Sequence, residues 1–294
     1  MPLIYWSAMR AVGPNPLALR IIATLVTLAT VLLMYLLGEA WFDRGTALVG
    51  ALFLVSMPYC LRMGTAVLTD MPVTMLFVLG LLLVDRLSRA PSFRLSVALG
   101  LVIGLGLLSK YTMLLVYPVL FCQFLALPRL RRATGHVALA VFTSIVVWGG
   151  WLAFAYANGI LGAQTQTVSR YAGAVTGGGW RYMIEMLTTE LTSAVGFYTL
   201  PLILLGTLRA LRERSEADLA VLMWILPVFG LVALTLPDPR YFMPAFPGFA
   251  IAMARGSQRY RQLEPRIVLL ALLLCGGSLY LFADWSRATF LFLR

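Results

Sequence analysis

The first long hydrophobic stretch of the chain is residues 18–38, ALRIIATLVTLATVLLMYLLG, and Arg20 is the only charged residue in it. An α-helix rises about 1.5 Å per residue, so a helix of this length covers the roughly 30 Å of a bilayer's hydrocarbon core. A membrane-spanning strand would alternate apolar and polar residues, and the run from Val26 to Leu37 does not alternate. The stretch therefore predicts a transmembrane helix.

The rest of the chain repeats this pattern. Of its 294 residues, 61% are hydrophobic and 12% are charged, and the mean hydropathy of +0.88 is far above that of soluble domains. The composition predicts an all-α, polytopic transmembrane bundle of about ten helices. The ten predicted segments are 18–38, 46–62, 70–84, 95–108, 111–127, 137–157, 191–208, 219–236, 242–254 and 267–283.

The net charge of +11 has a membrane explanation. The basic residues lie between hydrophobic segments, where lipid headgroups and membrane orientation account for them better than a nucleic acid partner does. Assigned to alternate loops, fourteen of the 23 Lys and Arg residues fall on one side and nine on the other. The richer side is predicted to be cytoplasmic in a multi-pass protein of the cell (inner, cytoplasmic) membrane. The outer face then holds both termini, the 62–70 turn, Lys110, the loop 158–190 and the turn 238–240.

The chain is interpreted as one transmembrane domain, residues 1–294, because no internal repeat or separate soluble region interrupts it. Residues 1–17 carry aromatic side chains that suit a segment lying in the membrane interface. Residues 158–190 form a long outer loop rich in Gly, Thr and Gln, and long loops in compact folds are often functional. Gly100, Gly104 and Gly106 resemble a small-residue stripe that lets two helices approach closely.

Several polar residues gather on the predicted outer face. Lys110 is the only lysine in the chain, and it could contact a phosphate or simply extend to the membrane interface. Asp70 could take a proton in catalysis or cap a helix. Arg62 and Arg240 could converge on Asp70 as anion ligands, with Tyr241 beside them, or the arginines could pair with Asp70 or Asp238 and fix helix ends.

The long outer loop adds two further candidates, Arg170 and Arg181. They could contact a substrate, or they could be ordinary exposed residues at an interface. No metal-binding residue is assigned, because the cysteines lack paired spacing and His136 has no ligand partner at metal-binding spacing. We therefore leave the cofactor open between none and a divalent metal.

Five short motifs, taken in order, give the chain a family resemblance. Their order and spacing resemble the GT-C class of membrane glycosyltransferases, among the relatives of protein O-mannosyltransferases and aminoarabinose transferases. The resemblance implies a polyprenyl-phosphate-linked sugar as donor, membrane lipids as surroundings, and a lipid, glycan or protein as acceptor. It also implies contact between Lys110 and the carrier phosphate. The motifs are PLIYW at 2–6, ALR at 18–20 with YLLG at 35–38, LTDMP at 68–72, GLGLLSK at 104–110 and RYFMPAFP at 240–247.

The resemblance also implies a membrane helix and an outer loop with an essential acidic residue ahead of the PLIYW motif. On that expectation the family base lies upstream of Met1, and the 294-residue chain alone is inactive in transfer. If the chain is active, Asp70 is the candidate base. A transporter or lipid flippase and an inactive membrane fragment are the alternatives, and the sugar, the acceptor, the carrier length and the oligomeric state are left open.

Overall fold

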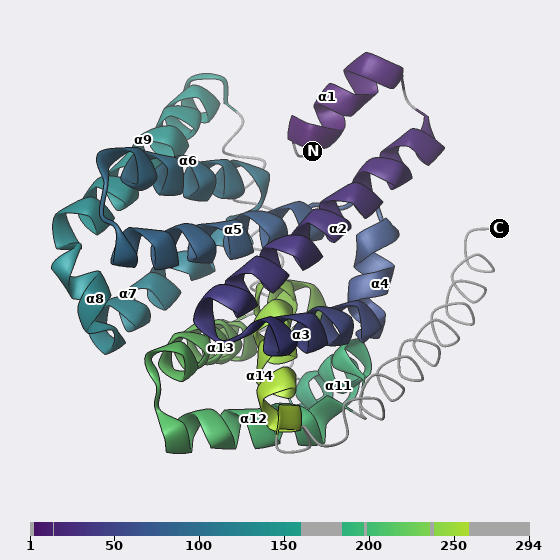
Figure 1. Ribbon diagram of the computed structural model, residues 1–294. Helices are drawn as coiled ribbons and strands as arrows, with labels where there is room; N and C mark the ends of the chain where they lie inside the picture. The colour runs from purple at the N-terminus through teal and green to yellow at the C-terminus, as the bar shows by residue number, and fades with distance from the viewer. Residues whose placement is uncertain (1–2, 14, 160–183, 197–198, 236–237, 259–294) are drawn as a thin grey trace.

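The computed structural model describes residues 3–13, 15–159, 184–196, 199–235 and 238–258. The described residues form helices and no strand, so the predicted all-α class is confirmed (Figure 1). The first half contains α1 Leu3–Val12, α2 Pro16–Trp41, α3 Arg44–Ser56, α4 Pro58–Thr65, α5 Asp70–Arg89, α6 Phe93–Ser109, η1 Tyr111–Leu115, α7 Val116–Ala126, α8 Pro128–Arg132 and α9 Thr134–Ala157. The second half contains η2 Met186–Glu190, α11 Leu191–Val195, α12 Leu200–Glu213, α13 Glu216–Thr235, η4 Pro239–Ala245 and α14 Phe246–Ser257.

Four of these helices are long and apolar enough to cross a membrane, and up to six spans result if each bent helix pair counts as one. α6 and the η1–α7 segment are apolar but shorter. The segment 267–283 lies outside the described residues, so the number of about ten stays a prediction. The single-domain assignment and the interfacial role of residues 1–17 also stay predictions, and most of the loop 158–190 lies outside the described residues.

The predicted segment 46–62 is helical, but it is not one straight helix. It is broken into α3 and α4, which are bent by 71°. Met57 between them has extended backbone angles, and Pro58 begins α4. Proline has no N–H and clashes with the preceding turn, but it is well accommodated in the first turn of a new helix. The bend sets the direction of α4, which carries Arg62 and leads into the turn before Asp70.

α6 and α9 pack closely side by side (Figure 1), and the glycine stripe explains why. A Cβ on Gly100 would lie 2.5 Å from the Ala140 carbonyl oxygen, and one on Gly104 would lie 2.7 Å from the Val147 Cβ. Both distances are too short for a side chain, so the predicted close approach is confirmed for these two positions. Gly106 serves a different contact, because its Cβ would meet the Met113 side chain of η1.

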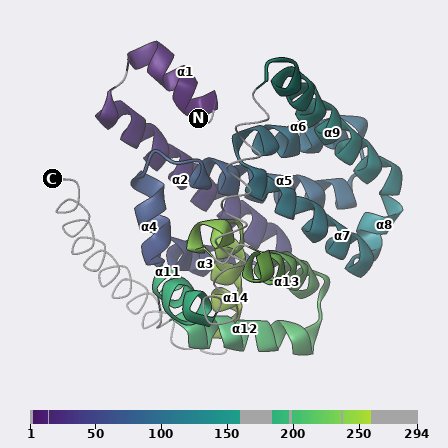
Figure 2. The same ribbon diagram turned by 180° about the vertical axis from the view of Figure 1, so that it is seen from behind.

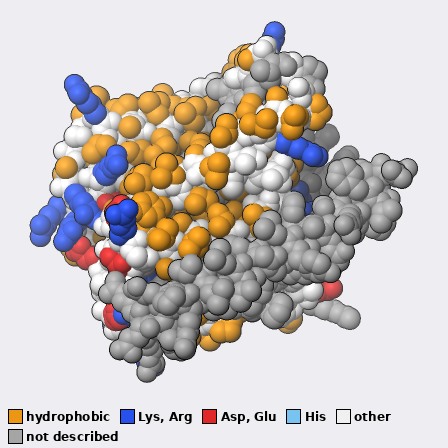
Figure 3. All heavy atoms as spheres, turned by 45° about the vertical axis from the view of Figure 1, so that its right-hand side comes forward, with side chains coloured by type: hydrophobic (Ala, Val, Ile, Leu, Met, Phe, Trp, Pro, Cys, Tyr) orange, Lys and Arg blue, Asp and Glu red, His pale blue; other side chains and the backbone are white. Residues whose placement is uncertain are grey.

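Two separate clusters of polar side chains lie among the described helices. Asp70, Lys110 and Tyr241 meet at one end, whereas Asp218 and Arg255 meet among residues from the predicted basic loops. Figure 2 shows the same bundle from behind, with α5 to α9 gathered on one side. Figure 3 shows Lys and Arg side chains at the left edge of the visible face, next to acidic side chains, further basic side chains at its upper right, and apolar side chains across its middle. The alternate-loop assignment and the end that faces the cytoplasm both stay predictions.

Candidate active site

A lysine and an aspartate form the centre of the site. Lys110 Nζ lies 2.5 Å from Asp70 Oδ1, and the two side chains are only 14% and 4% exposed. A buried charge is costly unless it is paired, so each side chain holds the other at this place. Lys110 is therefore not a lysine that simply extends to the interface, and its ammonium is fixed beside a carboxylate.

The backbone fixes Lys110 from both sides. α6 ends at Ser109, and Lys110 follows it in an extended conformation while its N–H donates to the Gly106 carbonyl at 2.9 Å. Its own carbonyl accepts the Met113 N–H at 3.1 Å, which starts η1. The change from α6 to a 3₁₀ turn thus places the side chain at the junction of two elements.

Asp70 is the first residue of α5, and the capping interpretation needs correction. Thr69 occupies the N-cap position and makes no side-chain capping bond. The Asp70 carboxylate contacts Lys110 instead, while its carbonyl accepts the Thr74 hydroxyl at 2.9 Å. A negative charge in the first turn still benefits from the positive end of the helix dipole.

Two tyrosines complete the environment of the lysine. Lys110 Nζ lies 4.9 Å from the ring centroid of Tyr241, within cation–π range. The Tyr111 hydroxyl donates to the Tyr241 hydroxyl at 2.6 Å. Sequence reasoning named Tyr241 but missed Tyr111, although Tyr111 directly follows Lys110. The 3₁₀ turn after Lys110, which brings Tyr111 back to η4, has no marker in the sequence.

η4 is held in place by the core. The fully buried Trp224 of α13 donates its indole N–H to the Pro244 carbonyl at 2.9 Å. The same ring stacks on Phe77 of α5 at 6.3 Å. Because α5 also carries Asp70, one tryptophan links the helix of the aspartate to the turn of Tyr241.

The two predicted arginines lie close to this centre. Arg240 pairs with Asp238 at 3.2 Å, two residues away in the same turn, so the pair does not join two helix ends as one alternative proposed. The hydrogen bond to Asp238 raises the pKa of the Arg240 guanidinium above its ordinary value, and the charges of Asp238 and Asp70 add to this. The Arg62 guanidinium lies 5.7 Å from the ring centroid of Tyr59.

Tyr59 shows how the charges are grouped. It interacts electrostatically with Asp238, Arg62, Arg240 and Asp70. The structure therefore brings together the three predicted charged residues Arg62, Asp70 and Arg240, around a tyrosine of α4 that sequence reasoning did not name. Arg170 and Arg181, the two candidates from the long loop, lie outside the described residues.

Comparison with known proteins gives this arrangement a family. Residues 1–151, just over half of the chain, match the family model described as dolichyl-phosphate-mannose-protein mannosyltransferase. The chain belongs to this family. The match includes α1, Asp70 and Lys110, but not Tyr241. No curated protein matches the chain.

Solved structures show the fold of this mannosyltransferase-family chain. ArnT from Cupriavidus metallidurans in the apo state is 17% identical, with a TM-score of 0.66 over 92% of this chain and 50% of that protein. The same enzyme bound to undecaprenyl phosphate is 16% identical, with a TM-score of 0.61 over 92% of this chain and 51% of that protein. An oligosaccharyltransferase from Archaeoglobus fulgidus, in complex with Zn and sulfate, is 18% identical, with a TM-score of 0.59 over 92% of this chain and 41% of that protein. The chain is thus a multi-pass membrane protein with the GT-C fold, and it spans about half the length or less of these proteins.

The described residues of this family member contain no group of three or more His, Cys, Asp or Glu side chains that could hold a metal ion. Asp70 contributes one carboxylate, and its nearest charged neighbour is a lysine rather than a second metal ligand. An ammonium ion beside a carboxylate competes with a cation for it. The described residues therefore show no metal site, and the choice between no cofactor and a divalent metal stays a prediction.

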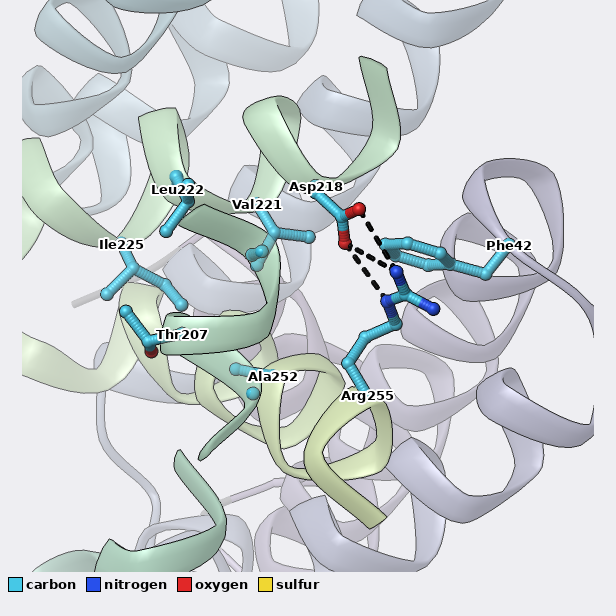
Figure 4. A pocket seen from close by; sticks show the side chains of 10 residues that line it. Phe42, Thr207, Asp218, Val221, Leu222, Ile225, Ala252 and Arg255 are labelled. Carbon is cyan, nitrogen blue, oxygen red and sulfur yellow. Dashed lines mark hydrogen bonds and ion pairs between the residues drawn. The ribbon is translucent and has the colours of Figure 1, made fainter. Parts of the chain in front are cut away.

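A second polar cluster lies among the residues of the predicted basic loops. Arg255 is 9% exposed and Asp218 is fully buried. Figure 4 shows the guanidinium of Arg255 beside this carboxylate and beside the ring of Phe42. The ring centroid lies 4.6 Å from Arg255 Cζ. The described side chains around the pair leave no space for a ligand. Sequence reasoning had counted Arg255 as a loop residue; the structure gives it a role in packing.

Proposed function

We propose that the chain takes part in the transfer of a sugar from a polyprenyl-phosphate carrier to a lipid, glycan or protein acceptor at the outer face of the cytoplasmic membrane. The observation that carries this proposal is the shielded Lys110–Asp70 pair over the ring of Tyr241. Such a transfer needs a cation for the phosphate and a carboxylate for a proton. Family membership and the GT-C fold support the same reaction class.

The residues have distinct tasks in this proposal. The acceptor hydroxyl oxygen forms a bond to the anomeric carbon of the sugar, and the bond from that carbon to the phosphate oxygen breaks. The bonding electrons leave with the polyprenyl phosphate, whose negative charge Lys110 stabilises. The hydroxyl proton passes to a carboxylate, for which Asp70 is the candidate in this chain.

Asp70 and Lys110 affect each other in this scheme. Without ligand, the ammonium contacts the carboxylate at 2.5 Å. An arriving phosphate shares the ammonium, which leaves the carboxylate with less positive charge near it and makes it a better proton acceptor. Carrier binding would thus prepare the base, and both steps would use the same lysine.

The remaining candidates surround this pair. Arg62 and Arg240 add positive charge near Tyr59, and guanidinium groups suit phosphate oxygens. Tyr241 offers its ring to Lys110 and a hydroxyl to the ligand. Arg170 and Arg181 are proposed as contacts for the sugar or the acceptor. An ArnT structure bound to undecaprenyl phosphate is compatible with a polyprenyl phosphate as carrier.

Phosphate-dependent binding tests the proposed function. A short-chain polyprenyl phosphate and the matching polyprenol, which lacks the phosphate, are titrated against the detergent-solubilised chain. We expect saturable binding of the phosphate and at least tenfold weaker binding of the polyprenol, since one charge-assisted contact contributes about 1.5–3 kcal/mol. Equal binding of the two lipids, or no binding of either, would contradict the proposal.

A further inference from the structure

The hydroxyl of Tyr5 differs from the other buried polar groups of the described chain. Tyr5 lies in α1 and is 0% exposed. Among the described residues, its hydroxyl is the only buried side-chain nitrogen or oxygen without a hydrogen-bond partner. Burying a hydroxyl without a partner is unfavourable, and native structures leave few such groups. A phenylalanine would fill the same space without this cost.

The hydroxyl lies near the candidate site. Burial, and next the negative charge of Asp70, raise the pKa of Tyr5 to about 12. The effect of Asp70 shows that the phenol is within electrostatic range of the carboxylate that pairs with Lys110. At neutral pH the phenol keeps its proton, so it can donate a hydrogen bond to an acceptor.

Two other donors of the site already have an acceptor in the described structure. Lys110 contacts Asp70 at 2.5 Å, and the Tyr111 hydroxyl donates to Tyr241 at 2.6 Å. Among the described residues the Tyr5 hydroxyl is a donor with no acceptor, and it lies within electrostatic range of the carboxylate that pairs with Lys110. A phosphate brought in by Lys110 would supply acceptor oxygens in this neighbourhood.

We propose that Tyr5 is a further ligand-contacting residue, whose hydroxyl donates a hydrogen bond to a phosphate oxygen of the lipid carrier. This inference rests on the proposed function, because that function provides the anion. It assigns the PLIYW segment a direct part in carrier recognition and joins α1 to the site of α5 and α6. The unsatisfied hydroxyl in the ligand-free protein is then a donor kept for the ligand.

Two hydroxyl deletions test this assignment. Tyr5→Phe removes the unpaired hydroxyl, and Tyr117→Phe is the matched control, because the Tyr117 hydroxyl has a partner in Ser144 at 2.9 Å. For each variant, the melting temperature is measured without ligand, and the affinity for a short-chain polyprenyl phosphate is measured in detergent. Inorganic phosphate is added as a competitor to distinguish the lipid from free phosphate.

The two variants should behave in opposite ways. Tyr5→Phe should melt at the parent's temperature or above. It should bind the lipid about tenfold more weakly, because it loses one hydrogen bond to a charged acceptor. Tyr117→Phe should melt lower and bind like the parent. Parental affinity in Tyr5→Phe, or a lower melting temperature without ligand, would overturn the inference and leave the proposed function standing. Competition by inorganic phosphate at equal concentration would overturn the lipid assignment, and a parent that does not bind would remove the proposed function itself.

Discussion

Arg255 makes two hydrogen bonds of 3.0 Å to the carboxylate of Asp218, one from Nε and one from Nη2. The same guanidinium also reaches Glu213 at 2.6 Å and Gln258 at 2.6 Å. Asp218 in turn accepts the Ser215 hydroxyl at 2.6 Å and belongs to the first turn of α13. One arginine of α14 thus connects the end of α12 with the start of α13.

Truncating this arginine should destabilise the fold strongly. Arg255→Ala leaves the fully buried Asp218 without its cation, and breaking a buried pair in this way costs about 3–5 kcal/mol. Arg212→Ala is the control, because Arg212 is exposed on α12 and its loss should cost within about 0.5 kcal/mol. Thermal unfolding of both variants in detergent measures the difference. Equal melting temperatures would show that the cluster contributes little to stability.

A pair of glycine substitutions tests the helix packing. A Cβ on Gly206 of α12 would lie 1.7 Å from the backbone carbonyl oxygen of Ala252 in α14, which cannot rotate away. Gly206→Ala should therefore destabilise by about 1–3 kcal/mol or more, as overpacking does. Gly230→Ala should be neutral or stabilising by up to about 1 kcal/mol, since nothing lies within 4 Å of its Cβ position and alanine favours a helix. Similar unfolding of the two variants would contradict the α12–α14 contact.

Replacing Asp70 should separate transfer from binding. Asp70→Asn removes the candidate proton acceptor and also frees the ammonium of Lys110 from its carboxylate partner. In membranes that show sugar transfer, we expect transfer to fall by about 10²-fold or more while affinity for the carrier is kept or increased. The measurement combines transfer from a radiolabelled polyprenyl-phosphate sugar with carrier binding. Parental transfer in Asp70→Asn would exclude Asp70 as the base.

Two single cysteines test the orientation in the membrane. Thr65 is exposed at the end of α4 near the candidate site, and Arg212 is exposed near the Arg255 cluster. In a background without Cys60, Cys122 and Cys275, a membrane-impermeant maleimide should label Thr65→Cys from outside intact cells and should not label Arg212→Cys. Labelling of only the second variant would invert the predicted orientation and move the candidate site to the cytoplasmic face.

Hydropathy and loop charge are enough to predict much of this fold. Each described hydrophobic segment contains helix, because an apolar run in lipid must satisfy its backbone internally. The positions of Lys110, Asp70 and Tyr241 at one end follow from counting alternate loops. The sequence does not show the break before Pro58, because whether a proline begins a new helix or bends an old one depends on packing around it.

The finer parts of the site depend on contacts between distant residues. The pairing of Lys110 with Asp70 joins residues 40 positions apart, and the contact between Tyr111 and Tyr241 joins residues 130 apart. No local pattern distinguishes these residues from interfacial lysines and tyrosines. Arg255 likewise resembles an ordinary loop arginine until α13 places Asp218 against it.

Carrier binding by variants of Lys110 tests the account most directly. The affinity of a short-chain polyprenyl phosphate is measured on the purified, detergent-solubilised parent, Lys110→Ala and Lys110→Arg, with melting temperatures recorded alongside. Lys110→Ala should bind about tenfold to a hundredfold more weakly, because it loses a charge-assisted contact of about 1.5–3 kcal/mol in a shielded site. Lys110→Arg should retain only part of the affinity that Lys110→Ala loses, since a planar guanidinium does not replace a compact ammonium. Parental affinity in a folded Lys110→Ala variant would contradict the phosphate-binding role of this lysine.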